Sequence, residues 1–121
     1  MKKKKYDRSA EVEERLLSFI FRDGSDALAK CIQSNIMPKT FHVPANRIIY
    51  ETLLEMHAAG KVIDIAAVAE ELKAKGSMNK IGRYAYLCQI SSRVPKVVQV
   101  GYFIERLLEM QQLRKNCCAG E

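Results

Sequence analysis

The sequence predicts an all-α protein: a compact orthogonal bundle of about six helices, with a long C-terminal helix that begins a helical hairpin. Apolar residues recur at steps of three and four through most of the 121-residue chain, and the alternating pattern of strands is nearly absent. Glycines and prolines divide these segments where helices end or restart, at Gly24, Pro44, Gly60, Gly76 and Pro95. With 48% apolar residues, the composition suits one folded domain.

The first two helices are separated by Asp23-Gly24-Ser25, a sequence that favours a helix end followed by a new start. We predict the first helix from Ser9, as its N-cap, to about Arg22. Its apolar face is Val12, Leu16, Phe19 and Ile20. The second runs from Asp26 to about Ser34, with Leu28, Cys31 and Ile32 inward. The following segment, 35–43, is predicted as a loop.

Two further helices are framed by Pro44, Gly60 and Gly76. Proline is favoured in a first turn because its missing N–H costs nothing there, so we predict a third helix from Pro44 to about Ala59. Its buried positions are Ile49, Leu53 and Met56. After an extended link, Asp64 is placed to cap a fourth helix whose apolar face is Ile65, Val68, Ala69 and Leu72.

A fifth helix is predicted from about Arg83 to Ser92, with Tyr84, Leu87 and either Ile90 or Cys88 inward. Pro95 forces a restart, and the last helix is predicted from about Val97 to Asn116. This helix is apolar on more than one side, at Val100, Phe103, Ile104, Leu107, Leu108 and Met110. Such a helix at a chain end either completes the core or contacts a partner, and the pattern leaves both open.

Three regions follow: a disordered basic tail (1–8), a globular helical head (9–95) and a long C-terminal helix (96–121). The formal net charge is +6, of which the tail carries +4. Its basic run, Lys2, Lys3, Lys4 and Lys5, is typical of a solvated chain end, although it could also attract phosphate.

Composition argues against several classes of protein. No segment is apolar enough to span a membrane, and charged residues occupy the place where a signal peptide would need an apolar region, so we expect a cytoplasmic protein. The four cysteines, Cys31, Cys88, Cys117 and Cys118, are too scattered for a disulfide scaffold. The two histidines, His42 and His57, lie far from any cysteine pair with metal-ligand spacing, so we expect no metal.

No catalytic constellation emerges either. The chain has no Gly-rich phosphate loop, and the acidic pairs Glu13-Glu14 and Glu70-Glu71 are interpreted as solvated helix surface. We therefore predict no enzyme activity and no cofactor in this chain. Helix-turn-helix DNA binding is the alternative, but the fourth helix would expose charges of both signs where a recognition helix needs donors to base edges.

The ordered anchors of the sequence resemble the N-terminal domain of the DnaB family of bacterial replicative helicases. Glu11 to Leu17 is similar to that family's "ExExxLL" opening. Further anchors match "HxxIFxAIxxLxxxGxxxD", "TVxxxLxxxG", "GGxxYL" and a following "P", at Arg47-Ile48-Ile49-Tyr50-Glu51, Met56, Gly60, Asp64, Val68, Leu72, Gly76, Gly82, Tyr86-Leu87 and Pro95. The similarity covers residues 11–115. The chain departs from the pattern at Asn46 for histidine, Ala67 for threonine, Arg83 for the second glycine and Lys96 after the proline.

The resemblance implies a helical head and a hairpin that joins subunits into a dimer or a hexameric ring, which recruits primase or a helicase loader and contacts DNA only indirectly. ATP and Mg would belong to a separate C-terminal motor domain, so we expect this chain to be a fragment of a longer protein. We predict an assembly and recruitment domain with partner-facing residues Tyr102, Phe103, Leu107 and Leu108. The alternative is a DNA-binding or helicase-loader protein that uses Lys2 to Lys5.

Overall fold

The computed structural model describes residues 2–92 and 100–119, and every regular element in this part of the chain is a helix. The predicted all-α class, with about six helices, is confirmed. The elements are α1 (Lys2–Asp23), α2 (Ser25–Gln33), η1 (Pro38–Thr40), α3 (Pro44–Ala58), α4 (Ile65–Ala74), η2 (Met78–Ile81), α5 (Arg83–Ser91) and α6 (Val100–Ala119), where η marks a short 3₁₀ helix.

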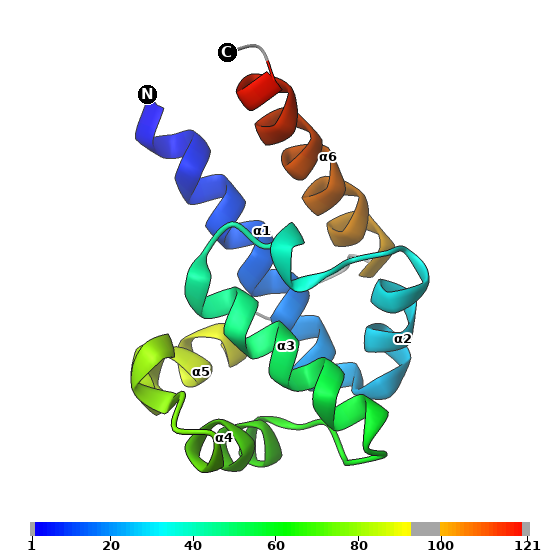
Figure 1. Ribbon diagram of the computed structural model, residues 1–121, viewed down its shortest axis with the longest axis vertical. Coiled ribbons are helices and arrows are strands. Elements are labelled where there is room, and N and C mark those ends of the chain that lie inside the picture. Colours follow the sequence, from blue (N-terminus) through cyan, green and yellow to red (C-terminus); the bar gives the residue numbers. More distant parts are fainter. Residues whose placement is uncertain (1, 93–99, 120–121) are drawn as a thin grey trace.

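Helix α1 is the centre of the arrangement, because α2, α3, α5 and α6 all pack against it (Figure 1). Helix α6 runs antiparallel to α1, so the first turns of α1 and the last turns of α6 lie at the same end of the molecule. Helix α3 crosses α1, and α4 and α5 close the opposite end. The C-terminal helix is therefore packed on the head, whereas the sequence had suggested a separate region from residue 96.

The core is one continuous apolar cluster to which all six α-helices contribute. Its largest fully buried side chains are Tyr50, Phe41, Leu16, Leu17, Ile20, Leu28, Ile49, Leu53, Met56, Leu72, Leu87 and Ile90. Tyr50 is tolerated there because its hydroxyl donates a 2.7 Å hydrogen bond to the Ile36 carbonyl. Fixed in this way, the head provides a rigid support for α6.

Most helix ends follow the predicted signals. Asp64 caps α4, since its Oδ1 accepts a 2.8 Å hydrogen bond from the Ala67 amide. Gly60 and Gly76 follow α3 and α4 with φ of 72° and 73°, the left-handed conformation that ends helices. The start of α1 differs, because the helix begins at Lys2. Residues 2–8 therefore continue the helix instead of forming a disordered tail, and Ser9 is not an N-cap.

The inward faces of the two shortest α-helices were predicted only in part. In α2, Ala27, Leu28 and Cys31 are buried, but Ile32 points about 100° away from Cys31 and is exposed. In α5, Leu87 and Ile90 are buried, while Cys88 and Tyr84 are exposed. Tyr84 lies in the first turn, at the edge of the core, where it lines a surface groove with residues of α4.

Candidate protein-interaction surface

Helix α6 has an inner face that belongs to the core. Phe103 is 4% exposed, Leu107 is fully buried, and Ile104 between them is also buried, on a helix that packs against α1 and α2. The ring of Phe103 contacts that of Phe19 on α1, with 6.3 Å between their centroids. The prediction that Phe103 and Leu107 face a partner is therefore wrong, because antiparallel packing on α1 turns both into this chain's own interior.

The opposite face of α6 carries exposed apolar side chains. Tyr102 is 53% exposed and Leu113 is 66% exposed. Eleven residues apart, they lie on the same side of the helix, together with Arg106 and Glu109 at the positions between them. Arg106 Nη1 and Glu109 Oε1 form a 3.0 Å ion pair. We call Tyr102, Arg106, Glu109 and Leu113 the α6 stripe.

The α6 stripe is held in place near both of its ends. On the inner face, Phe103 and Leu107 anchor the first half of the helix in the core. Farther along, Arg114 Nη2 donates a 2.9 Å hydrogen bond to the Thr40 carbonyl in η1. Leu108, which is partly buried against the core, borders the stripe. Of the four predicted partner-facing residues, Tyr102 and Leu108 thus remain available at the surface.

A buried polar network fixes α1, α3 and α5 relative to one another. The Glu13 carboxylate is fully buried and accepts hydrogen bonds from the backbone amides of His42 (2.6 Å) and Val43 (3.2 Å) and from Asn46 Nδ2 (2.8 Å). Asn46 Oδ1 in turn accepts a 2.6 Å bond from the Tyr86 hydroxyl. The carboxylate sits at the N-terminus of α3, where the helix dipole stabilises negative charge.

This network was missed because the acidic pairs were interpreted as solvated surface. That interpretation is wrong for Glu13 and Glu14, which are both buried. It fits Glu70, which is exposed, whereas Glu71 is partly buried and pairs with Lys61. One signal was present in the sequence: Glu13, Asn46 and Tyr86 are among the polar residues at the matched motif positions, and their side chains are linked by hydrogen bonds in the structure.

The basic residues considered for DNA contact lie at the start of α1 and beside the end of α4. Lys2 to Lys5 form the first turns of α1, and their side chains lie outside the described part. Lys75, which follows the last residue of α4 as its C-cap, donates hydrogen bonds to Thr52 Oγ1 at 2.9 Å and to Glu55 Oε1 at 3.1 Å. Within residues 2–92 and 100–119 no group of three His, Cys, Asp or Glu side chains could hold a metal ion.

The cysteines that the structure describes differ in environment. Cys31 is buried, and desolvation raises the pKa of its thiol to about 12, which keeps it neutral and unreactive. Cys88 is exposed. The side chains of Cys117 and Cys118, as well as Pro95 and Lys96, lie outside the described residues. None of the described helices is long and apolar enough to cross a bilayer.

Comparison with known proteins identifies the family. Residues 5–109 match the DnaB-like helicase N terminal domain. The replicative DNA helicase DnaB of Geobacillus stearothermophilus is 28% identical over 108 residues, which cover 89% of this chain and 23% of that protein. DnaB of Mycobacterium leprae is 30% identical over 95 residues, which cover 78% of this chain and 16% of that protein.

The fold agrees with this match. The crystal structure of the N-terminal domain of DnaB helicase from Mycobacterium tuberculosis superposes with a TM-score of 0.85 at 29% identity, covering 92% of this chain and 79% of that one. The chain spans about a fifth of the length of the curated relatives that it matches. The match over most of the chain and the shared fold lead to one assignment: the chain belongs to the family of DnaB-like replicative DNA helicase N-terminal domains.

Proposed function

We propose that this chain is a non-catalytic assembly and recruitment domain, which supports formation of a helicase dimer or hexameric ring and recruits primase or a helicase loader in the cytoplasm. The exposed α6 stripe carries the proposal. Two large apolar side chains, Tyr102 and Leu113, stand on a helix whose other side is already packed, so they are available to a partner. ATP and Mg would act in a separate C-terminal motor domain, and DNA contact would be indirect.

The order of residues along the stripe favours a second copy of the chain as the partner. Residues 102 and 113 lie at equal distances in sequence from the middle of the stripe, as do residues 106 and 109. In an antiparallel pair of α6 helices related by two-fold symmetry, Tyr102 would therefore meet Leu113 of the second copy, and Arg106 would meet Glu109 of the second copy. Such self-complementarity is what a two-fold interface requires.

Sedimentation equilibrium tests the assembly proposal. We expect the wild-type chain to self-associate and the double variant Tyr102→Asp with Leu113→Asp to be monomeric, because it places carboxylates in the apolar contact. Arg106→Glu should weaken association through like charges, and adding Glu109→Arg should restore it. Ile32→Asp on α2 is the matched control, since Ile32 is also an exposed apolar residue but lies outside the stripe.

Two results would contradict the proposal: a wild-type chain that stays monomeric at every concentration, or an Ile32→Asp variant as disruptive as the double variant. Recruitment is tested separately by titrating purified primase into the wild-type chain by calorimetry. A saturable heat of binding supports recruitment, and its absence in both the monomeric and the associated protein counts against it.

A second candidate function is DNA binding by the N-terminal arm. The observation that favours it is the start of α1 at Lys2, which places four lysines at the positive end of a helix dipole. Deleting Lys2 to Lys5 separates the two functions. DNA binding predicts that the affinity for duplex DNA collapses. It also predicts that the slope of log affinity against log salt concentration becomes less steep by up to about 0.9 for each lost phosphate contact. Assembly predicts unchanged self-association.

A further inference from the structure

The second half of α6 receives little apolar support from the head. The residues of α6 that are buried in the core, Phe103, Ile104 and Leu107, all lie in its first half. From residue 108 to residue 114, every side chain is partly exposed or exposed. Figure 1 shows the last turns of α6 extending away from α3, α4 and α5. Leu113, one of the two apolar ends of the α6 stripe, therefore stands on a part of the helix that core packing does not fix.

Arg114 connects this half of α6 to the head. Its Nη2 donates a 2.9 Å hydrogen bond to the Thr40 carbonyl in η1, in a partly buried position. Thr40 is buried, and the fully buried Phe41 that follows it packs its ring on that of Tyr50, with 4.9 Å between the centroids. The next two backbone amides are held by the Glu13 carboxylate. The acceptor of the Arg114 bond thus belongs to a segment that is fixed to both α1 and α3.

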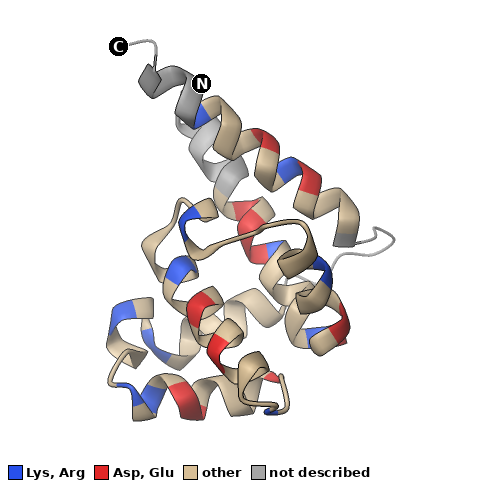
Figure 2. Cartoon of the chain, turned by 45° about the vertical axis from the view of Figure 1, so that its right-hand side comes forward, with Lys and Arg blue, Asp and Glu red and all other residues tan. Residues whose placement is uncertain are grey.

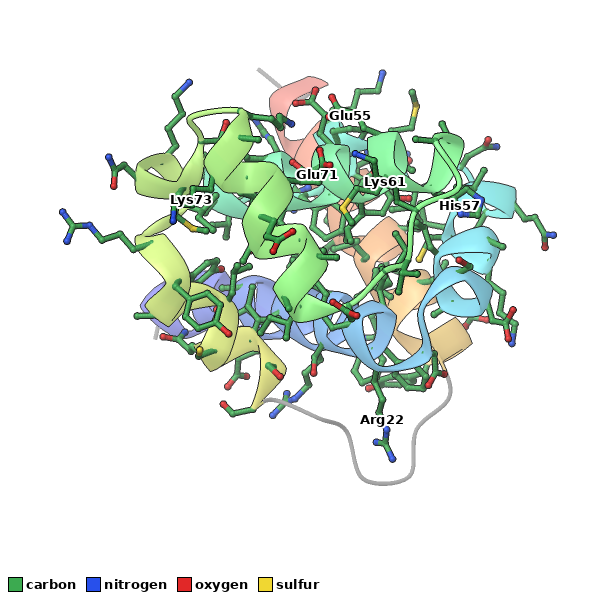
Figure 3. All side chains as sticks on the ribbon, turned by 90° about the horizontal axis from the view of Figure 1, so that it is seen from below. Arg22, Glu55, His57, Lys61, Glu71 and Lys73 are labelled. Atoms are coloured by element: carbon green, nitrogen blue, oxygen red, sulfur yellow. The ribbon has the colours of Figure 1, made fainter. Side chains whose placement is uncertain are left out.

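Other charged side chains are bound less firmly. Figure 3 shows Lys61 and Glu71 at the surface beside α4, and Arg22 pointing away from the helices. Exposed ion pairs such as that of Lys61 and Glu71 contribute little, because water competes for both partners. Figure 2 shows acidic and basic positions alternating along α6, so no excess of one charge draws this helix to the head. The Arg114 bond differs, since its charged donor meets a fixed acceptor in a partly buried place.

We propose that Arg114 is a positioning residue for self-association, an inference that rests on the function proposed for the α6 stripe. Its bond to Thr40 orders the second half of α6 before a second copy arrives, so that Leu113 is already in line with Tyr102. Association then loses less conformational entropy. Arg114 itself lies eleven residues after Phe103 and so on the inner side of α6, where it makes no contact with the second copy.

Sedimentation equilibrium of variants of the full chain tests the inference. We expect Arg114→Ala to raise the dissociation constant of self-association about three- to tenfold, the range of one hydrogen bond. Arg114→Lys should raise it less, because lysine keeps the charge and a donor. Arg22→Ala is the matched control: it removes an arginine that points away from the helices and should associate as the wild type does.

A double-mutant cycle separates positioning from a general loss of stability. If Arg114 acts through Leu113, Arg114→Ala should change the dissociation constant by less than about twofold when Leu113→Ala is already present. A purely structural role would weaken association equally in both backgrounds, and that result would overturn the inference. So would a wild type that associates while Arg114→Ala associates equally well, or an Arg22→Ala variant as weak as Arg114→Ala. A wild-type chain that stays monomeric at every concentration would overturn the proposed function and this inference together.

Discussion

Removing the Glu13 carboxylate should destabilise the fold more than any surface substitution on α1. Glu13→Ala leaves three donors without their acceptor: the amides of His42 and Val43 and the side-chain amide of Asn46. A hydrogen bond to a charged group contributes about 1.5–3 kcal/mol, and a buried donor left unsatisfied costs about 1–3 kcal/mol. The effect acts on three helices, because the network links α1 to α3 and, through Asn46, to α5.

The three donors do not count equally. Asn46 is fully buried, so its side-chain amide would pay the full penalty of an unsatisfied buried donor. His42 is exposed and Val43 is partly exposed, so water can reach these two residues and replace part of the lost hydrogen bonding. We therefore expect Glu13→Ala to lower the free energy of unfolding by about 3–5 kcal/mol, a large share of the 5–15 kcal/mol typical of a domain. Glu13→Gln should cost less, about 1–3 kcal/mol, since its oxygen still accepts while its NH₂ group faces a donor.

Urea denaturation followed by circular dichroism at 222 nm measures these differences. Glu11→Ala is the matched control: Glu11 lies on the same helix, is partly exposed, and its pairing with Arg15 at 4.0 Å should contribute less than about 0.5 kcal/mol. If Glu13→Ala costs no more than Glu11→Ala, or less than Glu13→Gln, the network does not hold the helices together as argued.

Three further changes test other parts of the structure by the same denaturation assay. Ser18→Ala should stabilise the fold by about 1 kcal/mol, because Ser18 Oγ is buried and has no hydrogen-bond partner among the residues that the structure describes. A loss of stability would contradict this. Arg83→Gly should stabilise the fold by about 0.5–1 kcal/mol, because Arg83 has a φ of 68°, a left-handed conformation that strains a residue with a side chain. Asn35→Gly, at a φ of 63°, should change the stability less, because asparagine tolerates that conformation. Equal effects of the two substitutions would refute the argument that the Arg83 backbone is strained. Burial raises the pKa of the Cys31 thiol from 9.0 to about 12, so between these pH values the thiol is deprotonated in the unfolded chain but not in the folded one. The free energy of unfolding should therefore fall as pH rises from 9 to 12, by at most about 1.4 kcal/mol per pH unit. Cys31→Ala should flatten that fall, and an unchanged slope would contradict the assignment.

Helix number and most boundaries could be predicted because their signals are local. These signals act on the backbone within a residue or two of their own position. In the structure Pro44 begins α3, Asp64 caps α4, and Gly60 and Gly76 end helices in the left-handed conformation. The start of α1 was not predictable in the same way. A run of like charges carries no periodic pattern of its own, so it was interpreted as a tail although the chain continues the helix from Lys2.

The functional faces required three-dimensional information. Tyr102, Phe103, Leu107 and Leu108 are all apolar, so periodicity shows that α6 has more apolar surface than one face can use but does not say which side is inward. Packing on α1 decides that Phe103 and Leu107 are buried and Tyr102 is exposed. Leu113 was not singled out, although its position in line with Tyr102 was readable from the spacing.

The buried carboxylate shows a second limit. Its partners, the amides of His42 and Val43, lie about thirty positions away in sequence and are backbone groups, which no side-chain pattern reveals. A charge next to the apolar positions of a helix is usually solvated, and only the crossing of α3 over α1 brings these donors to Glu13.

The most direct test of the assembly function is a dilution series of the wild-type chain followed by ¹⁵N–¹H correlation spectra. Self-association through the α6 stripe predicts concentration-dependent shifts at the amides of Tyr102, Arg106, Glu109 and Leu113, with Ile32 on α2 unaffected. Spectra that do not change with concentration, or shifts confined to residues outside α6, would contradict it.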